Sequence, residues 1–148
     1  MKPKIMPPTY FMILLVLSIV SYFIFPIKRM ILFPYNHLGW ILILFGGWLN
    51  IWADGIFKKK KTTVKPGEKS SGLVVGGPFK ISRHPMYLGM ASILFGVAIL
   101  CGVLICFIFP IIFIILIEFI FIPLEEKNME KVFGKRYLRY KTKVRRWV

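Results

Sequence analysis

The chain has 148 residues, enough for a single domain, and 57% of them are hydrophobic, above the roughly 45–50% typical of soluble proteins. It carries 21 Lys and Arg residues against 6 Asp and Glu residues, a net charge of +15 that would suggest a nucleic-acid partner for a soluble protein. Because these charges are excluded from long apolar runs, we assign them to a membrane surface with anionic lipid headgroups and expect no nucleic acid as a partner.

Long uncharged runs predict an all-α integral membrane protein, a single membrane domain with about four transmembrane helices. A bilayer core of about 30 Å needs roughly 20 apolar residues in a helix, so the first two runs are one span each. The run that follows Arg83 and continues to Leu124 is too long for one span, and we divide it at Gly102. The predicted spans cover about residues 9–25, 38–57, 85–100 and 103–124.

The polar segments set the expected topology. Residues 58–84 form a long polar connection, and residues 125–144 have the pattern of an amphipathic basic helix. Four spans place both termini, this connection and this helix on one side, which then carries 19 of the 21 Lys and Arg residues. Because Lys and Arg concentrate in cytoplasmic loops, we predict a multi-pass protein with both termini in the cytoplasm.

The first candidate site lies where the polar connection meets the third span, at Arg83, His84 and Tyr87. A purely structural interpretation is that Arg83 extends to lipid phosphates and His84 caps the helix. The functional interpretation is a ligand site, because free N–H groups at a helix start favour a carboxylate or phosphate. Tyr87 lies one helical turn after His84 on the same face, and Gly76 and Gly77 allow a ligand to approach the backbone closely.

Acidic side chains at the end of the fourth span form the second candidate site. Glu125 and Glu126 are either a solvated helix face or acceptors for ribose hydroxyls or an ammonium group. If the chain folds back once, this pair reaches the same membrane surface as His84. Glu118 lies at membrane depth, where an ionisable group is a functional candidate, but it could equally pair with a basic residue or be protonated. No Cys/His cluster has zinc spacing, so we expect no metal.

The motifs around both sites resemble those of a known family. The first resembles the signature of the isoprenylcysteine carboxyl methyltransferases and phospholipid methyltransferases, and reads Gly77-Pro78-Phe79-x-x-x-Arg83-His84-Pro85-x-Tyr87-x-Gly89. The second resembles their C-terminal signature, and reads Pro123-x-Glu125-Glu126 followed by Phe133-Gly134-x-x-Tyr137-x-x-Tyr140-x-x-x-Val144. The resemblance covers roughly residues 50–148. Phe79 departs from the family pattern, which more often has a tyrosine there.

This resemblance implies an integral membrane enzyme that uses S-adenosylmethionine and acts on a lipid or prenylated substrate. The residues implied for the cofactor site are Gly77, Pro78, Phe79, His84, Pro85, Tyr87, Leu88, Glu125 and Glu126. We expect Arg83, or a tail arginine such as Arg136 or Arg139, to hold an acidic substrate group. Glu126 is also a catalytic candidate, because a general base could be Glu118, His84 or one of the paired glutamates.

The expected reaction is most like prenylcysteine carboxyl O-methylation, with phospholipid amine N-methylation as the alternative. A carboxylate acceptor is already ionised at neutral pH, whereas an amine must first lose a proton. A non-catalytic basic membrane scaffold would also explain the spans and the charge. A proton-coupled transporter would use Glu118, but four short spans offer little room for it and no inverted repeat is visible.

Overall fold

The computed structural model describes residues 6–25, 29–59 and 72–148. These ranges contain helices and no β-strand beyond an isolated bridge between Arg29 and Val103. The α-helices are α1 (Pro7–Ile24), α2 (Gly39–Lys59), α3 (Pro85–Cys101), α4 (Ile108–Leu116), α5 (Ile122–Phe133) and α6 (Lys135–Lys143). Short 3-10 helices are η1 (Tyr35–Leu38), η2 (Gly77–Lys80) and η3 (Leu104–Phe107), and a π-helix, η4 (Ile117–Phe121), joins α4 to α5.

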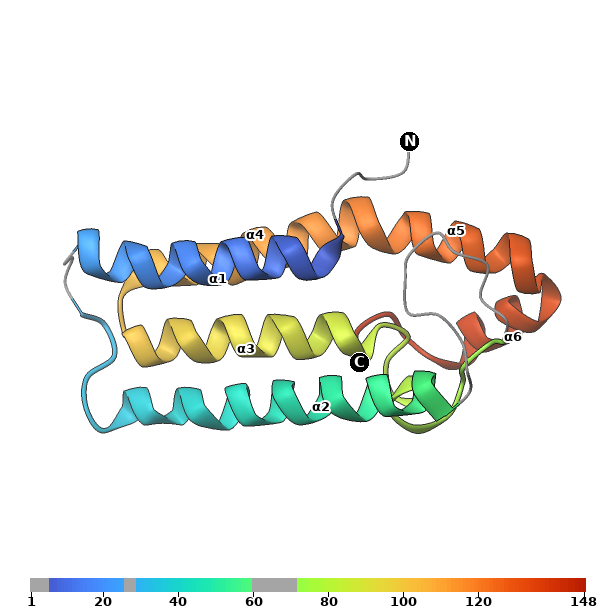
Figure 1. The fold of residues 1–148 in the computed structure, drawn as a ribbon, viewed down its shortest axis with the longest axis horizontal. Coiled ribbons are helices and arrows are strands. Elements are labelled where there is room, and N and C mark those ends of the chain that lie inside the picture. The colour runs from blue at the N-terminus through green and yellow to red at the C-terminus, as the bar shows by residue number, and fades with distance from the viewer. Residues whose placement is uncertain (1–5, 26–28, 60–71) are drawn as a thin grey trace.

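Helices α1, α2, α3 and α4 run side by side along the long axis of the molecule (Figure 1). The central helix is α3, which packs against α1, α2 and α4. Helices α5 and α6 extend beyond one end of this bundle, and the C-terminus returns to the start of α3 at the same end (Figure 1). That end therefore brings together segments from the beginning, middle and end of the chain.

The outer surface of the bundle is that of a membrane protein. Segments Pro7–Ile24, Tyr35–Lys59 and Leu104–Phe133 are long and apolar enough to cross a bilayer, and α3 is a further apolar helix of 17 residues. Large hydrophobic side chains point outward, among them Phe23, Ile51 and Phe119, each about three-quarters exposed. Exposed apolar area on this scale is unfavourable in water. The predicted all-α integral membrane fold is confirmed, while the count of four spans stays a prediction.

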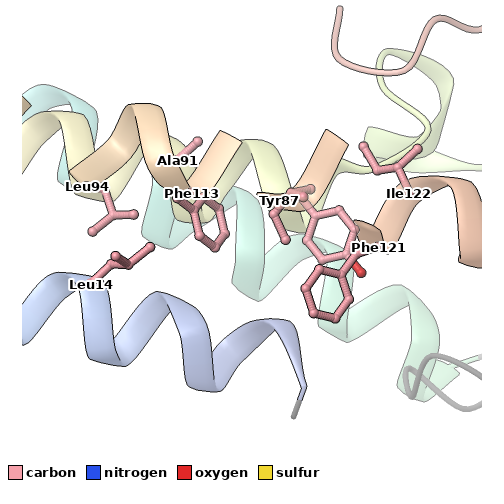
Figure 2. Packing of buried hydrophobic residues seen from close by; sticks show 8 residues of the cluster. Leu14, Tyr87, Ala91, Leu94, Phe113, Phe121 and Ile122 are labelled. Atoms are coloured by element: carbon pink, nitrogen blue, oxygen red, sulfur yellow. The ribbon is translucent and has the colours of Figure 1, made fainter. Parts of the chain in front are cut away.

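A hydrophobic cluster joins α1, α3 and α4. Figure 2 shows Leu14 of α1 facing Leu94 of α3 and Phe113 of α4, and the latter two side chains are fully buried. The cluster continues toward the polar end of the bundle, where the ring of Tyr87 lies beside Phe121 (Figure 2). Core packing thus holds the Tyr87 ring, and its hydroxyl lies at the polar end of the bundle.

Helices α2 and α3 approach more closely, through glycines. A Cβ atom on Gly46 would lie 2.4 Å from the Gly89 carbonyl oxygen, and one on Gly96 would lie 2.6 Å from the Gly39 carbonyl oxygen. Neither distance leaves room for a methyl group, so the two backbones are in direct contact. This close approach, a common use of small residues in membrane helices, fixes α3 against the first half of α2.

The C-terminal region differs from its prediction as one amphipathic helix over residues 125–144. Helix α5 already begins at Ile122 and continues from the fourth apolar segment through η4, so the change from apolar to charged residues does not interrupt the helix. The break falls later, at Gly134, whose φ of +51° favours glycine and ends α5 before α6 begins. Much of the polar connection predicted over 58–84 lies outside the described residues.

Candidate active site

The start of α3 is fixed by its own preceding loop. Pro85 occupies the first turn, where the N–H that proline lacks would have no helical partner. His84 is the N-cap residue, but its side chain makes no capping hydrogen bond. Instead, the His84 backbone N–H donates to Ser82 Oγ at 3.2 Å. The imidazole is therefore free of the capping role that the sequence left open for it.

The loop before Ser82 is anchored on α2. Gly77 has a φ of +62°, and a Cβ atom there would lie 2.2 Å from Ile56 Cδ1. Phe79 is buried, its ring packs edge-on against Phe57, and its carbonyl oxygen accepts a 2.6 Å hydrogen bond from the Tyr140 hydroxyl. Phe79 is thus held by its ring and its backbone carbonyl, and the hydroxyl of the tyrosine more common in the family is not needed to hold it.

The two candidate clusters are in contact. The Tyr87 hydroxyl donates a hydrogen bond to Glu125 Oε2 at 3.0 Å, and His84 Nδ1 lies 3.6 Å from the same oxygen. The His84 ring stacks on the Tyr87 ring with a centroid distance of 5.6 Å and an interplanar angle of 13°. Helices α3 and α5 therefore share one polar site, although 38 residues separate Tyr87 from Glu125.

Glu126 is the most buried of the acidic side chains at this end, with 3% of the residue exposed. Arg83 Nη1 lies 2.9 Å from its Oε1, and the guanidinium of Arg146 binds both of its oxygens at 3.2 Å. Lys141 Nζ lies 3.4 Å from Oε2, and His84 Nε2 lies 3.7 Å from Oε1. A buried carboxylate is stable only with such partners, so Glu126 organises the surrounding cations.

These contacts determine the protonation of the site. Burial lowers the pKa of His84, but the nearby carboxylates of Glu125 and Glu126 outweigh it, and the net pKa is raised above the ordinary 6.5. Burial, together with the charge of Glu126, raises the pKa of Tyr137 to about 12. The Tyr137 hydroxyl therefore stays protonated at neutral pH, and the His84 imidazole keeps its proton to a higher pH than an ordinary histidine does.

A cavity of about 140 Å³ lies beside Glu125 at this end of the bundle. Its polar wall is made by Arg83, His84, Tyr87 and Glu125. The apolar wall comes from the start of α1, the end of α2, the η2 loop and α3, and consists of Met6, Pro7, Pro8, Phe57, Phe79, Pro85, Met86 and Met90. Phe79 and Pro85 were predicted as site residues, and the predicted topology places these span ends on one side of the membrane. The other side chains of the apolar wall were not foreseen, because the sequence does not indicate which of them face one another.

The remaining predicted residues lie outside the cavity wall. Gly77 and Pro78 pack the η2 loop, Leu88 is half-buried on α3, and Glu126 lies behind Arg83 and His84. Arg136 is exposed on α6, away from these ion pairs. The arginine that joins the acidic cluster from the tail is instead Arg146.

Glu118 has partners in the C-terminal tail. Arg146 Nη1 lies 2.5 Å from Glu118 Oε1, and the Trp147 indole N–H donates to Glu118 Oε2 at 2.9 Å. Of the alternatives that the sequence left open, pairing with a basic residue is confirmed. Sequence reasoning missed Arg146 and Trp147, and also Ser82, whose hydroxyl donates to the Arg146 carbonyl oxygen. The only feature of the sequence that pointed to this tail is the apolar pair Trp147-Val148 at the end of a strongly basic stretch.

Comparison with known proteins assigns this architecture to a class. A solved structure of the eukaryotic intramembrane Ras methyltransferase ICMT (isoprenylcysteine carboxyl methyltransferase) matches 95% of the chain with a TM-score of 0.70 and 26% identity. The present chain spans 52% of that protein. The class is thus the integral membrane methyltransferases. Within it, the family model for phospholipid methyltransferases matches residues 35–136, and the chain belongs to this family.

A shorter relative matches part of the chain. An uncharacterized protein of Haemophilus influenzae is 41% identical over 63 residues, which are 43% of this chain and all of that protein. The expected resemblance to the isoprenylcysteine carboxyl and phospholipid methyltransferases is confirmed by the family and structural matches. The family match ends at residue 136, before Lys141, Arg146 and Trp147.

Proposed function

We propose that this protein transfers the methyl group of S-adenosylmethionine to a lipophilic acceptor at the cytoplasmic face of the membrane. One observation carries the proposal. A single cavity combines the hydrogen-bonded pair Tyr87 and Glu125, the buried imidazole of His84 and a wall of methionine and proline side chains. Such a cavity can hold a polar cofactor beside an apolar substrate chain.

The residues present suit this cofactor. The Glu125 carboxylate can accept hydrogen bonds from ribose hydroxyls or from an ammonium group. His84 Nε2 and Arg83 Nε are buried without a hydrogen-bond partner among the described residues, and both can donate to a carboxylate. The cavity of about 140 Å³ is smaller than the roughly 300–1,000 Å³ typical of ligand sites, so its wall must move to admit the whole molecule.

The protein's task in this reaction is alignment. When bound, S-adenosylmethionine would supply an electrophilic methyl group, which the acceptor atom would attack in line with the breaking carbon–sulfur bond, so that S-adenosylhomocysteine leaves. Glu125 and Tyr87 orient the polar site from two helices, and the apolar side chains of Met86 and Met90 exclude water. Fixing the two reactants in line and excluding water are the effects by which a site without covalent chemistry accelerates transfer.

A prenylcysteine carboxylate is the acceptor we favour. Its carboxyl group is ionised at neutral pH and needs no general base. The Arg83 guanidinium and the His84 imidazole, whose pKa is raised, line the cavity and would attract an anion. The likeness to isoprenylcysteine carboxyl methyltransferase over 95% of the chain supports this choice. The Glu126 carboxylate acts here by holding Arg83.

Phospholipid amine N-methylation is the second candidate, favoured by the family match. An ammonium group must lose a proton before it can attack, and Glu125 is the carboxylate in the cavity wall that could accept it.

Exposed basic side chains on α6, among them Lys135, Arg136 and Arg139, support contact with anionic headgroups. The same excess of basic residues supports a cytoplasmic position for this end.

The decisive experiment supplies methyl-labelled S-adenosylmethionine to protein in vesicles, with either a prenylated cysteine bearing a free carboxyl or phosphatidylethanolamine. Label in the prenylated cysteine supports O-methylation, and label in the phospholipid supports the alternative. Glu125→Gln serves as the site variant and Glu130→Gln on α5 as its control, because Glu130 pairs with Lys141 outside the cavity wall. If folded protein does not bind S-adenosylmethionine, the methyltransferase proposal is refuted, and a non-catalytic basic membrane scaffold becomes the better account.

A further inference from the structure

We infer that the C-terminal segment Arg145–Val148 is a strap that sets the shape of the candidate active site, with Arg146 as a positioning residue. Arg146 does not line the cavity, yet its guanidinium lies between Glu118 and Glu126. The inference rests on the proposed function only where it concerns cofactor affinity. Its structural part concerns how this chain holds Glu126 and can be tested without any cofactor.

The guanidinium is shared between two helical segments. Nη1 contacts Glu118 Oε1 at 2.5 Å, while Nε and Nη2 bind the two oxygens of Glu126 at 3.2 Å each. The planar donors of arginine fit a carboxylate in this two-pronged manner, which lysine cannot reproduce. Arg146 therefore fixes both the position and the orientation of the Glu126 carboxylate.

The rest of the strap is held by three hydrogen bonds with uncharged donors. The Ser82 hydroxyl donates to the Arg146 carbonyl oxygen at 2.9 Å, and the Arg83 backbone N–H donates to the Arg145 carbonyl oxygen at 3.0 Å. The Trp147 indole N–H donates to Glu118 Oε2. The tail thus connects the loop before α3 with η4 and α5, and Figure 1 shows the C-terminus beside the start of α3.

The π-helix explains why two acids eight residues apart reach one guanidinium. Eight residues of regular α-helix rotate about 800°, which would leave Glu118 and Glu126 about 80° apart around the axis. The π-helix Ile117–Phe121 turns more slowly for each residue, because its hydrogen bonds span five residues, and so reduces this difference. The π-helix therefore helps to place both carboxylates where Arg146 of the strap can bind them.

The strap acts on the cavity through Glu126. This carboxylate also holds Arg83 and lies near His84, both of which line the cavity. Without Arg146, Glu118 loses its cation at the edge of the apolar segment, and Glu126 keeps only Arg83, Lys141 and His84. We expect the carboxylate to turn toward these cations and to displace the cavity wall.

The first test is nuclear magnetic resonance of the detergent-purified chain, observing the four indole N–H signals and the imidazole of His84. The Trp147 signal is identified by its absence in Trp147→Phe. We expect it to be protected from solvent exchange in the wild type and to lose protection in Arg146→Ala. In the same variant we expect the His84 titration to move to higher pH, because one cation fewer shares Glu126.

The matched control is Arg145→Ala, which removes an adjacent exposed arginine side chain and keeps the backbone hydrogen bond. We expect both signals to remain as in the wild type. Arg146→Lys should restore the charge but not the two-pronged geometry. We therefore expect the His84 titration to return toward its wild-type pH, while the Trp147 indole N–H stays only partly protected from exchange. If Arg146→Ala leaves the folded protein with an unchanged His84 titration, the strap does not position Glu126.

The second test measures the dissociation constant for S-adenosylmethionine in the same samples. We expect Arg146→Ala to weaken binding about tenfold and Glu118→Gln in that background to recover part of the loss, because it removes the unpaired charge. Equal affinity in Arg146→Ala and Arg145→Ala would refute the strap's effect on the cavity. No binding by folded wild type would refute the proposed function, leaving the strap to be decided by the His84 titration.

Discussion

Tyr87 and Glu125 are joined by a 3.0 Å hydrogen bond that links the start of α3 to α5. Tyr87 belongs to the motif that opens the third apolar helix, and Glu125 to the acidic pair that follows the fourth. The bond is thus one of the direct contacts between the two parts of the sequence that resemble the family signatures. It also fixes a carboxylate at the wall of the cavity, where a cofactor would meet it.

We predict that Tyr87→Phe weakens cofactor binding while the fold is retained. The ring stays in the hydrophobic cluster, and the lost hydrogen bond costs about 1 kcal/mol of unfolding free energy. Glu125 loses its orientation, so affinity for S-adenosylmethionine should fall more than stability does. Calorimetry and thermal unfolding measure the two effects. The control is Tyr22→Phe, which loses the hydrogen bond that its hydroxyl accepts from Arg29, and neither residue lines the cavity.

The two arginines considered for substrate binding should behave differently. Arg83 is largely buried and paired with Glu126, so Arg83→Ala should destabilise the protein by about 3 kcal/mol, the lower end for a broken buried pair. Other cations remain around Glu126, which limits the loss. Arg136→Ala changes an exposed side chain and should stay within about 0.5 kcal/mol of wild type.

Methyl transfer by both variants decides the substrate role. We expect Arg83→Ala to reduce transfer strongly, and Arg83→Lys to recover only part of it because lysine lacks the planar donors. Arg136→Ala should transfer at the wild-type rate. If instead Arg136→Ala abolishes transfer while its stability is unchanged, the substrate group is held by α6, as one of the sequence-based hypotheses had it.

Charge segregation made the general architecture predictable. Uncharged runs in the sequence correspond to the apolar segments of the bundle, because a charged side chain in hydrocarbon is costly. Pro85 marked the start of α3 to the residue, since proline suits the first turn. The expectation that His84 and Glu125 converge on one site also agrees with the structure, because two antiparallel helices return the chain to its starting surface.

Long-range contacts of the tail could not be predicted in this way. Arg146 contacts Ser82 across 64 residues, and no periodicity connects them. Sequence reasoning named Arg136 and Arg139 as examples of a tail arginine and did not single out Arg146. The structure turns them outward, because Tyr137 and Tyr140 occupy the buried face of α6. The end of α5 at Gly134 was also missed, since its effect depends on a positive φ.

Close contact between α2 and α3 gives a prediction about assembly. Gly46→Leu should separate the helices or prevent folding, because even a Cβ atom there would lie 2.4 Å from the Gly89 carbonyl oxygen. Gly47→Leu is the matched control, since nothing lies within 4 Å of a Cβ atom at that position. Yield of monodisperse protein and its unfolding temperature are the measurements. Equal behaviour of both variants would contradict direct backbone contact.

The raised pKa of His84 predicts how stability depends on pH. Burial lowers this pKa, but the carboxylates of Glu125 and Glu126 raise it overall above 6.5, its ordinary value. The protonated imidazole therefore stabilises the folded state fully below about pH 6.5, and this contribution is lost as the pH rises through the folded-state pKa. We expect the unfolding temperature in detergent to fall as the pH rises above about 6.5, because the folded state must release a proton that the unfolded state has already lost.

The decline with pH should depend on the one buried histidine. His84→Gln should remove much of it, because glutamine cannot carry the charge that pairs with the two carboxylates. His37→Gln is the control, since His37 is exposed in the 3-10 helix before α2, at the opposite end of the bundle. A wild-type profile that is flat over this range, or one that persists in His84→Gln, would mean that the imidazole does not form charged contacts with Glu125 and Glu126.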